Sequence, residues 1–123
     1  MPQFDEKERA YLQGQILGRL ATVTRSGEPH VVPTGFRLDA EANTIRIGGH
    51  GFASSWKVSH MKRNPSVAFV VDDLASRDPW RVRGVEVRGQ ARLHSTGGES
   101  LGPGFDADWM EIVPTRIRSW GLD

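Results

Sequence analysis

The sequence predicts a mainly β domain, a small antiparallel β-barrel of roughly six strands with few helices. Short apolar runs, several of them alternating with polar residues, recur along the chain. The 14 glycines and 7 prolines lie mostly between these runs, where turns are expected. The longest strand-like segment, residues 79–94, changes the parity of its apolar residues at Gly84, which indicates the bulge or bend that lets a strand turn the corner of a barrel.

Length and composition narrow the class of protein. The chain has 123 residues, and we expect residues 1–123 to form one domain. With 16 basic and 15 acidic residues, the net charge of +1 argues against broad nucleic-acid binding. The absence of cysteine excludes disulfides, thiol catalysis and cysteine-based zinc sites. The charged start lacks the apolar core of a signal peptide, and no apolar run is long enough to cross a bilayer, so we expect a cytoplasmic protein without a membrane partner.

In the first half of the chain, a short helix is expected after Asp5, which can cap it, and before Gly14, which can end it. Three strands then follow, over residues 17–24, 30–38 and 44–49. The first two flank a turn rich in glycine, proline and serine, as in a hairpin.

In the second half, a helix starting near Ser54 is expected to stop at Asn64-Pro65, because a proline disfavours helix in the residue before it. Three further strands are expected, over residues 67–71, 79–94 and 109–120. Polar or glycine-rich loops connect them, over residues 72–78 and 95–108. In the last strand Ile117 has the opposite parity to Arg116 and Arg118, so we expect Ile117 to face the barrel.

The segment that joins the third strand to the helix carries residues suited to holding a phosphate. The strand ends in glycines, and the helix start that follows bears Ser54, Ser55 and Lys57. Free backbone N–H groups and the positive end of the helix dipole favour an anion at such a start. The competing interpretation is that Ser54 only caps the helix and that Lys57 belongs to a solvated basic face.

Several motifs, taken in order, resemble a known family. They are Leu17-Gly-Arg-Leu-Ala-Thr-Val-Thr24, Gly27-Glu-Pro-His-Val-Val-Pro33, the helix with Lys57, Asn64-Pro-Ser-Val-Ala68 and Val87-Arg-Gly-Gln-Ala91. Together they resemble the pyridoxamine phosphate oxidase-like split β-barrel proteins, the FMN-binding split-barrel type. The ending Pro114-Thr-Arg-Ile-Arg-Ser-Trp-Gly121 is similar to the short tail of the branch that uses the deazaflavin coenzyme F420. The resemblance implies a six-stranded antiparallel split β-barrel that forms a homodimer, with two cofactor sites in grooves between the subunits.

The resemblance also implies which residues bind the cofactor. Lys57 matches a basic phosphate ligand, while Ser55 stands where many members carry an arginine, so the pocket has less positive charge than the FMN phosphomonoester favours. This difference favours F420, a phosphodiester, over FMN. Thr34 is expected to hydrogen-bond the ring. The cofactor residues expected in full are Val32, Pro33, Thr34, Gly48, Gly49, Ser54, Ser55, Lys57, His60 and Trp80.

For several of these residues an ordinary structural role is the alternative. Thr34 is a common type of strand residue, and the paired glycines Gly48 and Gly49 are normal at the end of a strand. His60 is expected to point to solvent rather than to a phosphate. Trp80 either covers a ring face or the substrate, or belongs to the core.

The reaction that the resemblance implies is hydride transfer from a reduced deazaflavin to a small organic acceptor, which requires positioning and no nucleophilic side chain. We therefore expect no catalytic residue, and the histidines show no metal-binding spacing. The alternatives are an FMN-binding oxidoreductase of the same fold and a non-catalytic cofactor-binding protein. Pyridoxamine phosphate oxidase activity itself is disfavoured, because the short tail lacks the arginine and histidine pattern that grips that substrate's phosphate.

Overall fold

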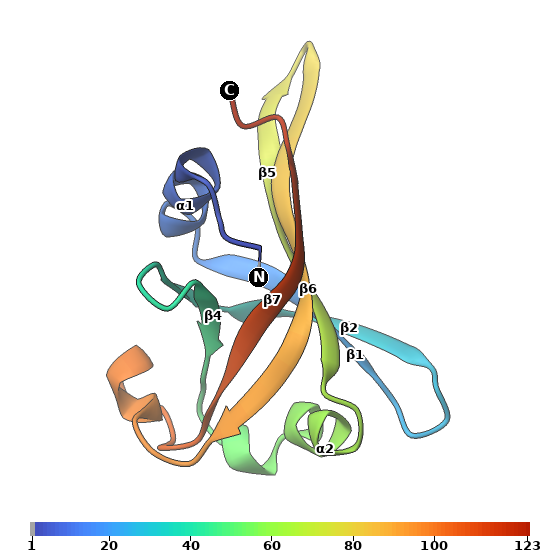
Figure 1. Ribbon diagram of the computed structural model, residues 1–123, viewed down its shortest axis with the longest axis vertical. Coiled ribbons are helices and arrows are strands. Elements are labelled where there is room, and N and C mark those ends of the chain that lie inside the picture. The colour runs from blue at the N-terminus through green and yellow to red at the C-terminus, as the bar shows by residue number, and fades with distance from the viewer. Residues whose placement is uncertain (1) are drawn as a thin grey trace.

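The structure is a computed structural model that describes residues 2–123. The helices are α1 (Glu6–Gln13), η1 (Phe52–Ser54), α2 (Trp56–Arg63) and η2 (Gly98–Leu101), of which η1 and η2 are short 3₁₀ turns. The strands are β1 (Leu17–Val23), β2 (Pro29–Gly35), β3 (Arg37–Asp39), β4 (Thr44–Ile47), β5 (Ser66–Arg77), β6 (Trp80–His94) and β7 (Trp109–Trp120). Figure 1 shows these strands curled into a half-barrel, with α1 on one side and α2 at one end. The prediction of a mainly β, split-barrel fold is confirmed.

All strands form one antiparallel sheet in the order β2-β1-β5-β6-β7-β4-β3. The sheet has seven strands rather than six, because the predicted strand 30–38 is broken at Phe36. Phe36 is buried, and its ring packs edge-on against Phe69 at 5.3 Å between ring centroids. Since β2 and β3 lie at opposite edges of the sheet, this break carries the chain from one edge to the other and makes the sheet curl.

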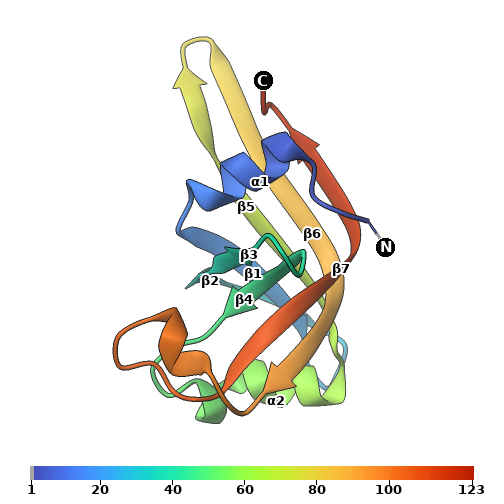
Figure 2. The same ribbon diagram turned by 60° about the vertical axis from the view of Figure 1, so that its left-hand side comes forward.

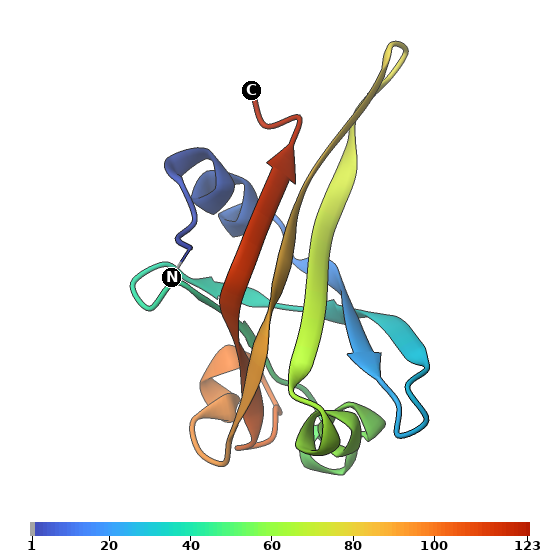
Figure 3. The same ribbon diagram turned by 45° about the vertical axis from the view of Figure 1, so that its right-hand side comes forward.

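The predicted loop over residues 72–78 is wrong, because β5 continues to Arg77. Its polar residues are held by cross-strand charge pairs. Asp73 accepts two hydrogen bonds from Arg83, at 2.7 and 3.0 Å, and Asp72 accepts one from Arg19 at 2.9 Å. Figure 3 shows β5, β6 and β7 side by side, with the turn between β5 and β6 reaching beyond the rest of the sheet.

The bulge expected at Gly84 is also not there. The register of the sheet shifts instead between Leu74 and Ser76 in β5, and beside Thr115 in β7. Gly84 has a packing role, because a Cβ atom there would lie 2.8 Å from the Trp120 ring and 2.8 Å from the Val71 carbonyl oxygen. The parity change in the sequence therefore marks the place where the ring of Trp120, the cross-strand partner of Gly84, lies over β6.

Side chains from the concave face of the sheet form the core. The most deeply buried apolar strand residues are Leu20, Ile45, Ile47, Phe69, Val71, Val85, Val87, Met110 and Ile112. The helix α1 begins at the predicted cap, where Asp5 and Glu8 make a reciprocal capping box, and it packs Leu12 into the core. Ile117 packs against the core while Arg116 and Arg118 are exposed, as predicted.

The predicted helix at Ser54 is divided in two. Ser54 ends η1, and Ser55 precedes α2, which lies across the lower end of the sheet in Figure 2. Among residues 2–123, no helix has the length and apolar character needed to cross a membrane.

Candidate cofactor site

Three segments of the chain carry most of the predicted cofactor residues. They are the strand β2, the end of β4 with Gly48 and Gly49, and the η1–α2 segment. Trp80 is the exception, because it begins β6 at the turn that lies at the opposite end of the sheet from α2 (Figure 1). Its side chain is 68% exposed, so the alternative of a core tryptophan is wrong. Within one chain, Trp80 is not brought together with the other predicted residues.

The start of α2 is open to an anion. Ser55 occupies the capping position, but its hydroxyl donates to the Phe52 carbonyl oxygen at 2.8 Å and does not cap α2. Ser54 does not cap the helix either, since its hydroxyl donates to the Gly51 carbonyl oxygen at 3.2 Å. The first turn holds no acidic residue, so its N–H groups have no side-chain acceptor there.

Lys57 lies in this first turn, half-buried, with its Nζ atom 5.4 Å from the centroid of the Trp56 ring. Among the described residues, no carboxylate forms an ion pair with it. A cation at a helix N-terminus is unfavourable with respect to the helix dipole. The position of Lys57 therefore fits a bound anion better than a role in helix stability.

Part of the expected anion site is occupied by the chain itself. The Asp106 carboxylate accepts hydrogen bonds from the backbone N–H of Gly51 at 3.2 Å and of Ala53 at 3.5 Å. The donors at the start of η1 thus have an acceptor, and those at the start of α2 remain available. Sequence reasoning missed Asp106, because nothing in the glycine-rich segment 95–108 indicated where it would fold.

The two glycines after β4 differ in their surroundings. A Cβ atom at Gly48 would lie 3.2 Å from Leu101 and 3.3 Å from Phe105, so Gly48 is packed against the segment that carries η2. A Cβ atom at Gly49 would meet nothing within 4 Å. Space for a close approach to the backbone therefore exists at Gly49, as a flat ring or a phosphate linker would need.

The side chains of β2 point to both faces of the sheet. Val32 and Thr34 pair with Leu20 and Gly18 and share their concave face, whereas Pro33 pairs with Arg19 on the other face. The Thr34 hydroxyl donates to the Gly35 carbonyl oxygen at 3.3 Å. A ring lying against the concave face could contact the side chains of Val32 and Thr34, but that of Pro33 only from the opposite side.

His60 faces the sheet and not the solvent, which corrects the expectation. Its Nδ1 atom lies 3.1 Å from the hydroxyl oxygen of Thr22, which is 1% exposed. The Trp56 ring lies 5.1 Å from the His60 ring and 4.2 Å from the His30 ring, between centroids. Sequence reasoning assigned no site role to His30 or Trp56, because their meeting depends on the register of β1 with β2 and on the docking of α2.

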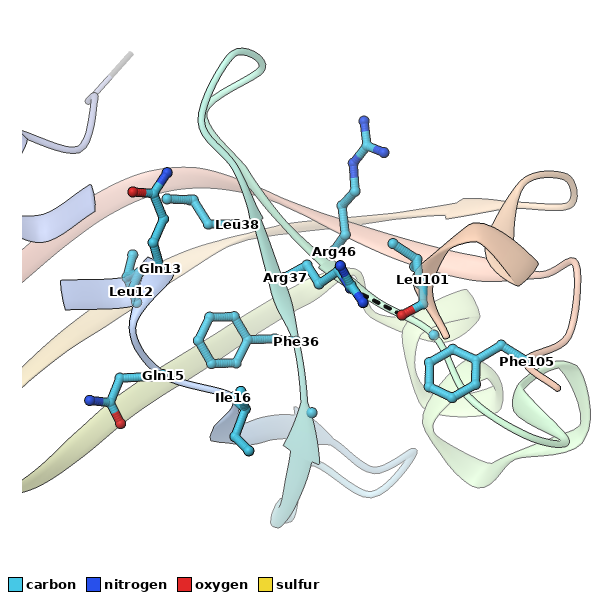
Figure 4. A pocket seen from close by; sticks show the side chains of 12 residues that line it. Leu12, Gln13, Gln15, Ile16, Phe36, Arg37, Leu38, Arg46, Leu101 and Phe105 are labelled. Carbon is cyan, nitrogen blue, oxygen red and sulfur yellow. Dashed lines mark hydrogen bonds between the residues drawn. The ribbon is translucent and has the colours of Figure 1, made fainter. Parts of the chain in front are cut away.

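A pocket of 530 Å³ lies at the break between β2 and β3. It lies between the end of α1, the break between β2 and β3, β4, and the segment that carries η2, as Figure 4 shows. Gly48 lines it, as does Gly35, the residue after Thr34. Within residues 2–123, no group of three or more histidine or acidic side chains could hold a metal ion. The arrangement therefore suits an organic ligand with a phosphate at α2, and Gly48 is the predicted cofactor residue that also lines the 530 Å³ pocket.

Comparison with known proteins agrees with this geometry. The family model described as Pyridoxamine 5'-phosphate oxidase matches residues 4–121. A 5a,11a-dehydrotetracycline/5a,11a-dehydrooxytetracycline reductase from Streptomyces rimosus subsp. rimosus is 44% identical over 120 residues, which cover 98% of this chain and 84% of that protein.

Solved structures share the fold at lower identity. A conserved hypothetical protein from Mycobacterium tuberculosis has a TM-score of 0.77 at 21% identity, over 99% of this chain and 91% of its own. The FAD binding protein from Mycobacterium smegmatis has a TM-score of 0.70 at 22% identity, over 97% and 96%. Since the family model covers almost the whole chain and a relative is 44% identical along nearly all of it, the chain belongs to the pyridoxamine 5'-phosphate oxidase family.

Proposed function

We propose that this protein is an F420-dependent reductase of a small organic acceptor, which works as a homodimer. Family membership and the 44% identical reductase support an oxidoreductase that acts on a small molecule. The observation that carries the choice of cofactor is the start of α2, where Lys57 is the one basic residue in the first turn and Ser55 precedes the helix. When bound, the reduced deazaflavin supplies a hydride from a ring carbon.

The residues at the start of α2 fit a phosphodiester better than a phosphomonoester. The N–H groups of the first turn and the Lys57 ammonium group supply donors and one positive charge. The Asp106 carboxylate, at the start of the preceding η1, adds negative charge to this end of the molecule. A phosphodiester carries one negative charge and a monoester nearly two, so this balance favours F420.

The remaining cofactor residues would position the ring. The open space beside Gly49 allows the cofactor to approach the backbone, and the side chains of Val32 and Thr34 lie on the concave face of β2. Orientation and exclusion of water are the contributions that hydride transfer requires of the protein. No side chain is needed as an acid, a base or a nucleophile.

The alternative cofactor is a flavin, and the similarity in fold to the FAD binding protein from Mycobacterium smegmatis favours it. The absorption spectrum of the protein loaded with its cofactor distinguishes the two, because a flavin gives two bands and the deazaflavin one near-violet band. A protein that binds either cofactor but transfers no hydride would support the third possibility, a cofactor-binding protein without catalysis.

The decisive experiment compares Lys57→Ala with Lys62→Ala, which removes the same charge from an exposed position of the same helix. Loss of a charge-assisted hydrogen bond of about 1.5–3 kcal/mol should weaken F420 binding roughly ten- to a hundred-fold in Lys57→Ala. Binding of a cofactor fragment without its phosphate should not change, and both variants should melt like the wild type. If Lys57→Ala binds F420 and FMN as tightly as the wild type, the proposed phosphate site is wrong.

A further inference from the structure

The 530 Å³ pocket at the break between β2 and β3, which Gly48 also lines, has mostly apolar walls. Leu12 and Ile16 come from the chain around the end of α1, Phe36 from the break between β2 and β3, and Leu101 and Phe105 from the segment that carries η2. Ile16 is 82% exposed although its side chain is fully apolar. This size lies within the range of small-molecule sites, which are largely apolar with a few polar groups that select the ligand.

Arg37 is the charged group placed to select a ligand there. Its Nε atom donates to the Leu101 carbonyl oxygen at 3.0 Å, which anchors the guanidinium group at the pocket wall. Figure 4 shows it reaching toward Leu101, between Phe36 and Phe105. Among residues 2–123, no carboxylate forms an ion pair with Arg37, so the other donors of its planar fork are free of acidic partners.

The second arginine of the pocket, Arg46, is already engaged. It forms an ion pair with Asp39, its guanidinium carbon lies 5.0 Å from the centroid of the Trp109 ring, and Figure 4 shows its side chain extending away from the pocket's phenylalanine rings. The lining residues include no aspartate or glutamate. The pocket thus combines aromatic surface with one available positive charge and no opposing negative charge.

We propose that this pocket binds the acceptor substrate, that the acceptor is an apolar organic anion with an ionised enol or carboxylate, and that Arg37 selects for this negative charge. The assignment rests on the proposed function, since the pocket is joined to the cofactor residues through Gly48 and through Gly35, which follows Thr34. Ile16, Leu101 and Phe105 provide apolar surface for the carbon skeleton of such a ligand. The Arg37 fork matches the two oxygens of a carboxylate or of an enolised diketone.

The test measures equilibrium binding of anthracene-2-carboxylate and of its uncharged analogue anthracene-2-carboxamide, by ligand fluorescence. The variants are Arg37→Gln, Arg37→Lys, and the control Arg25→Gln, which removes a charge from the exposed turn between β1 and β2. Arg37→Gln should weaken binding of the carboxylate about ten-fold or more and change binding of the amide less than about three-fold. Arg37→Lys should restore part of the loss, and Arg25→Gln should change neither ligand.

A variant whose added side chain fills the pocket tests independently whether the ligands bind there. A Cβ atom at Gly35 would have only the Ile16 carbonyl oxygen nearby, at 3.5 Å, so Gly35→Leu should fold and should weaken both ligands. If Arg37→Gln and Gly35→Leu melt normally and each binds both ligands as tightly as the wild type does, the assignment is overturned. F420 binding is measured in parallel. If Arg37→Gln binds the carboxylate as tightly as the wild type while F420 binding is intact and depends on Lys57, the pocket assignment alone is wrong. If Arg37→Gln weakens carboxylate binding but the protein binds neither F420 nor FMN, only the proposed function is wrong.

Discussion

At the residue scale, two glycines differ in the space around them. One is tightly packed, and the other has room for a ligand beside it. At Gly18 a Cβ atom would lie 2.3 Å from the Phe69 ring and 2.9 Å from the Val70 carbonyl oxygen. At Gly49 the same atom would meet nothing within 4 Å. The first glycine is therefore required by the core, and the second is required by nothing within the described chain.

This contrast predicts opposite effects of one substitution at two sites. Gly49→Ala should melt like the wild type but bind F420 roughly ten-fold more weakly, because the methyl group occupies the space where we propose that the cofactor approaches. Gly18→Ala should lower the free energy of unfolding by about 1–3 kcal/mol through overpacking against Phe69. Chemical denaturation and F420 titration measure both quantities. Unchanged F420 affinity in Gly49→Ala would remove Gly49 from the site.

Asp73 is the centre of a charged cluster that joins α1 to the β5–β6 hairpin. It accepts hydrogen bonds from Arg83 and, at 2.8 Å, from the hydroxyl of Tyr11. The hydrogen bonds from Arg83 lower the pKa of Asp73 below its ordinary value of 3.8, against the opposing effect of burial, and the bond from Tyr11 lowers it further. Burial, followed by the hydrogen bond to Asp73, raises the pKa of Tyr11.

This lowered pKa predicts how the cluster depends on pH. A depressed folded-state pKa stabilises the protein fully above the ordinary value of 3.8, and the stabilisation is lost as the pH falls through the folded-state pKa. Asp73→Asn should therefore lower the free energy of unfolding by about 1 kcal/mol at pH 7, a small value because the pair is partly exposed. The difference from wild type should shrink as the pH falls from ~4 through the lowered folded-state pKa, below which the wild-type carboxyl is also neutral. A difference that stays constant down to pH ~2 would contradict this account.

At the scale of elements, the sequence predicted those elements whose signals are local. The cap at Asp5, the alternation of Val85 and Val87, and the stop at Asn64-Pro65 each depend on neighbouring residues, and all three elements are present. The polar segment 72–77 was missed as a strand because its charges are satisfied by distant partners, such as Arg19 for Asp72. The break at Phe36 depends on a contact with Phe69, which no local pattern contains.

The residues of the candidate site also fall into two groups, those with a local sequence signal and those that depend on distant contacts. Lys57 and Gly49 could be predicted as candidates because a strand end followed by a helix start is visible in the sequence itself. Arg37 and Asp106 depend on contacts with residues 64 and 55 positions away. Their roles follow from the way segment 95–108 folds against β3 and η1, and its glycine-rich composition predicts only a loop.

The C-terminal half of β7 predicts an effect of truncation. Residues 116–120 pair with residues 84–88 of β6, and the Trp120 ring covers Gly84. Deletion of residues 116–123 should lower the melting temperature by several degrees. It leaves backbone groups of β6 without hydrogen-bond partners, and it removes Ile117, which covers part of the core. The resemblance to the family further predicts weaker dimerisation and cofactor binding. Melting, assembly and binding that all match the wild type would mean that this segment is dispensable.

At the scale of the whole molecule, the convex face of the sheet carries apolar side chains. Cross-strand pairing places on this face residues of β2, β1 and β5, namely Val31, Pro33, Leu17, Ala21, Ala68 and Val70. Val31 is 63% exposed and Leu17 48%. Arg19 lies among them, paired with Pro33 and Val70, and forms an ion pair with Asp72. Exposed apolar surface rimmed by polar groups is typical of interaction sites. It is the surface that we expect the second subunit of the proposed homodimer to cover.

The last prediction is that Val31→Glu disrupts this dimer. Light scattering at micromolar concentration should give twice the chain mass for the wild type and for Leu93→Glu, which places the same charge on a side chain 38% exposed elsewhere on β6. Val31→Glu should give the mass of one chain, because a carboxylate buried against an apolar partner face has no counter-charge. If the sites lie in grooves between subunits, this variant should also bind F420 more weakly than the wild type. A Val31→Glu monomer that keeps full F420 affinity would show that each chain carries a complete site, and the shared-groove arrangement would be wrong.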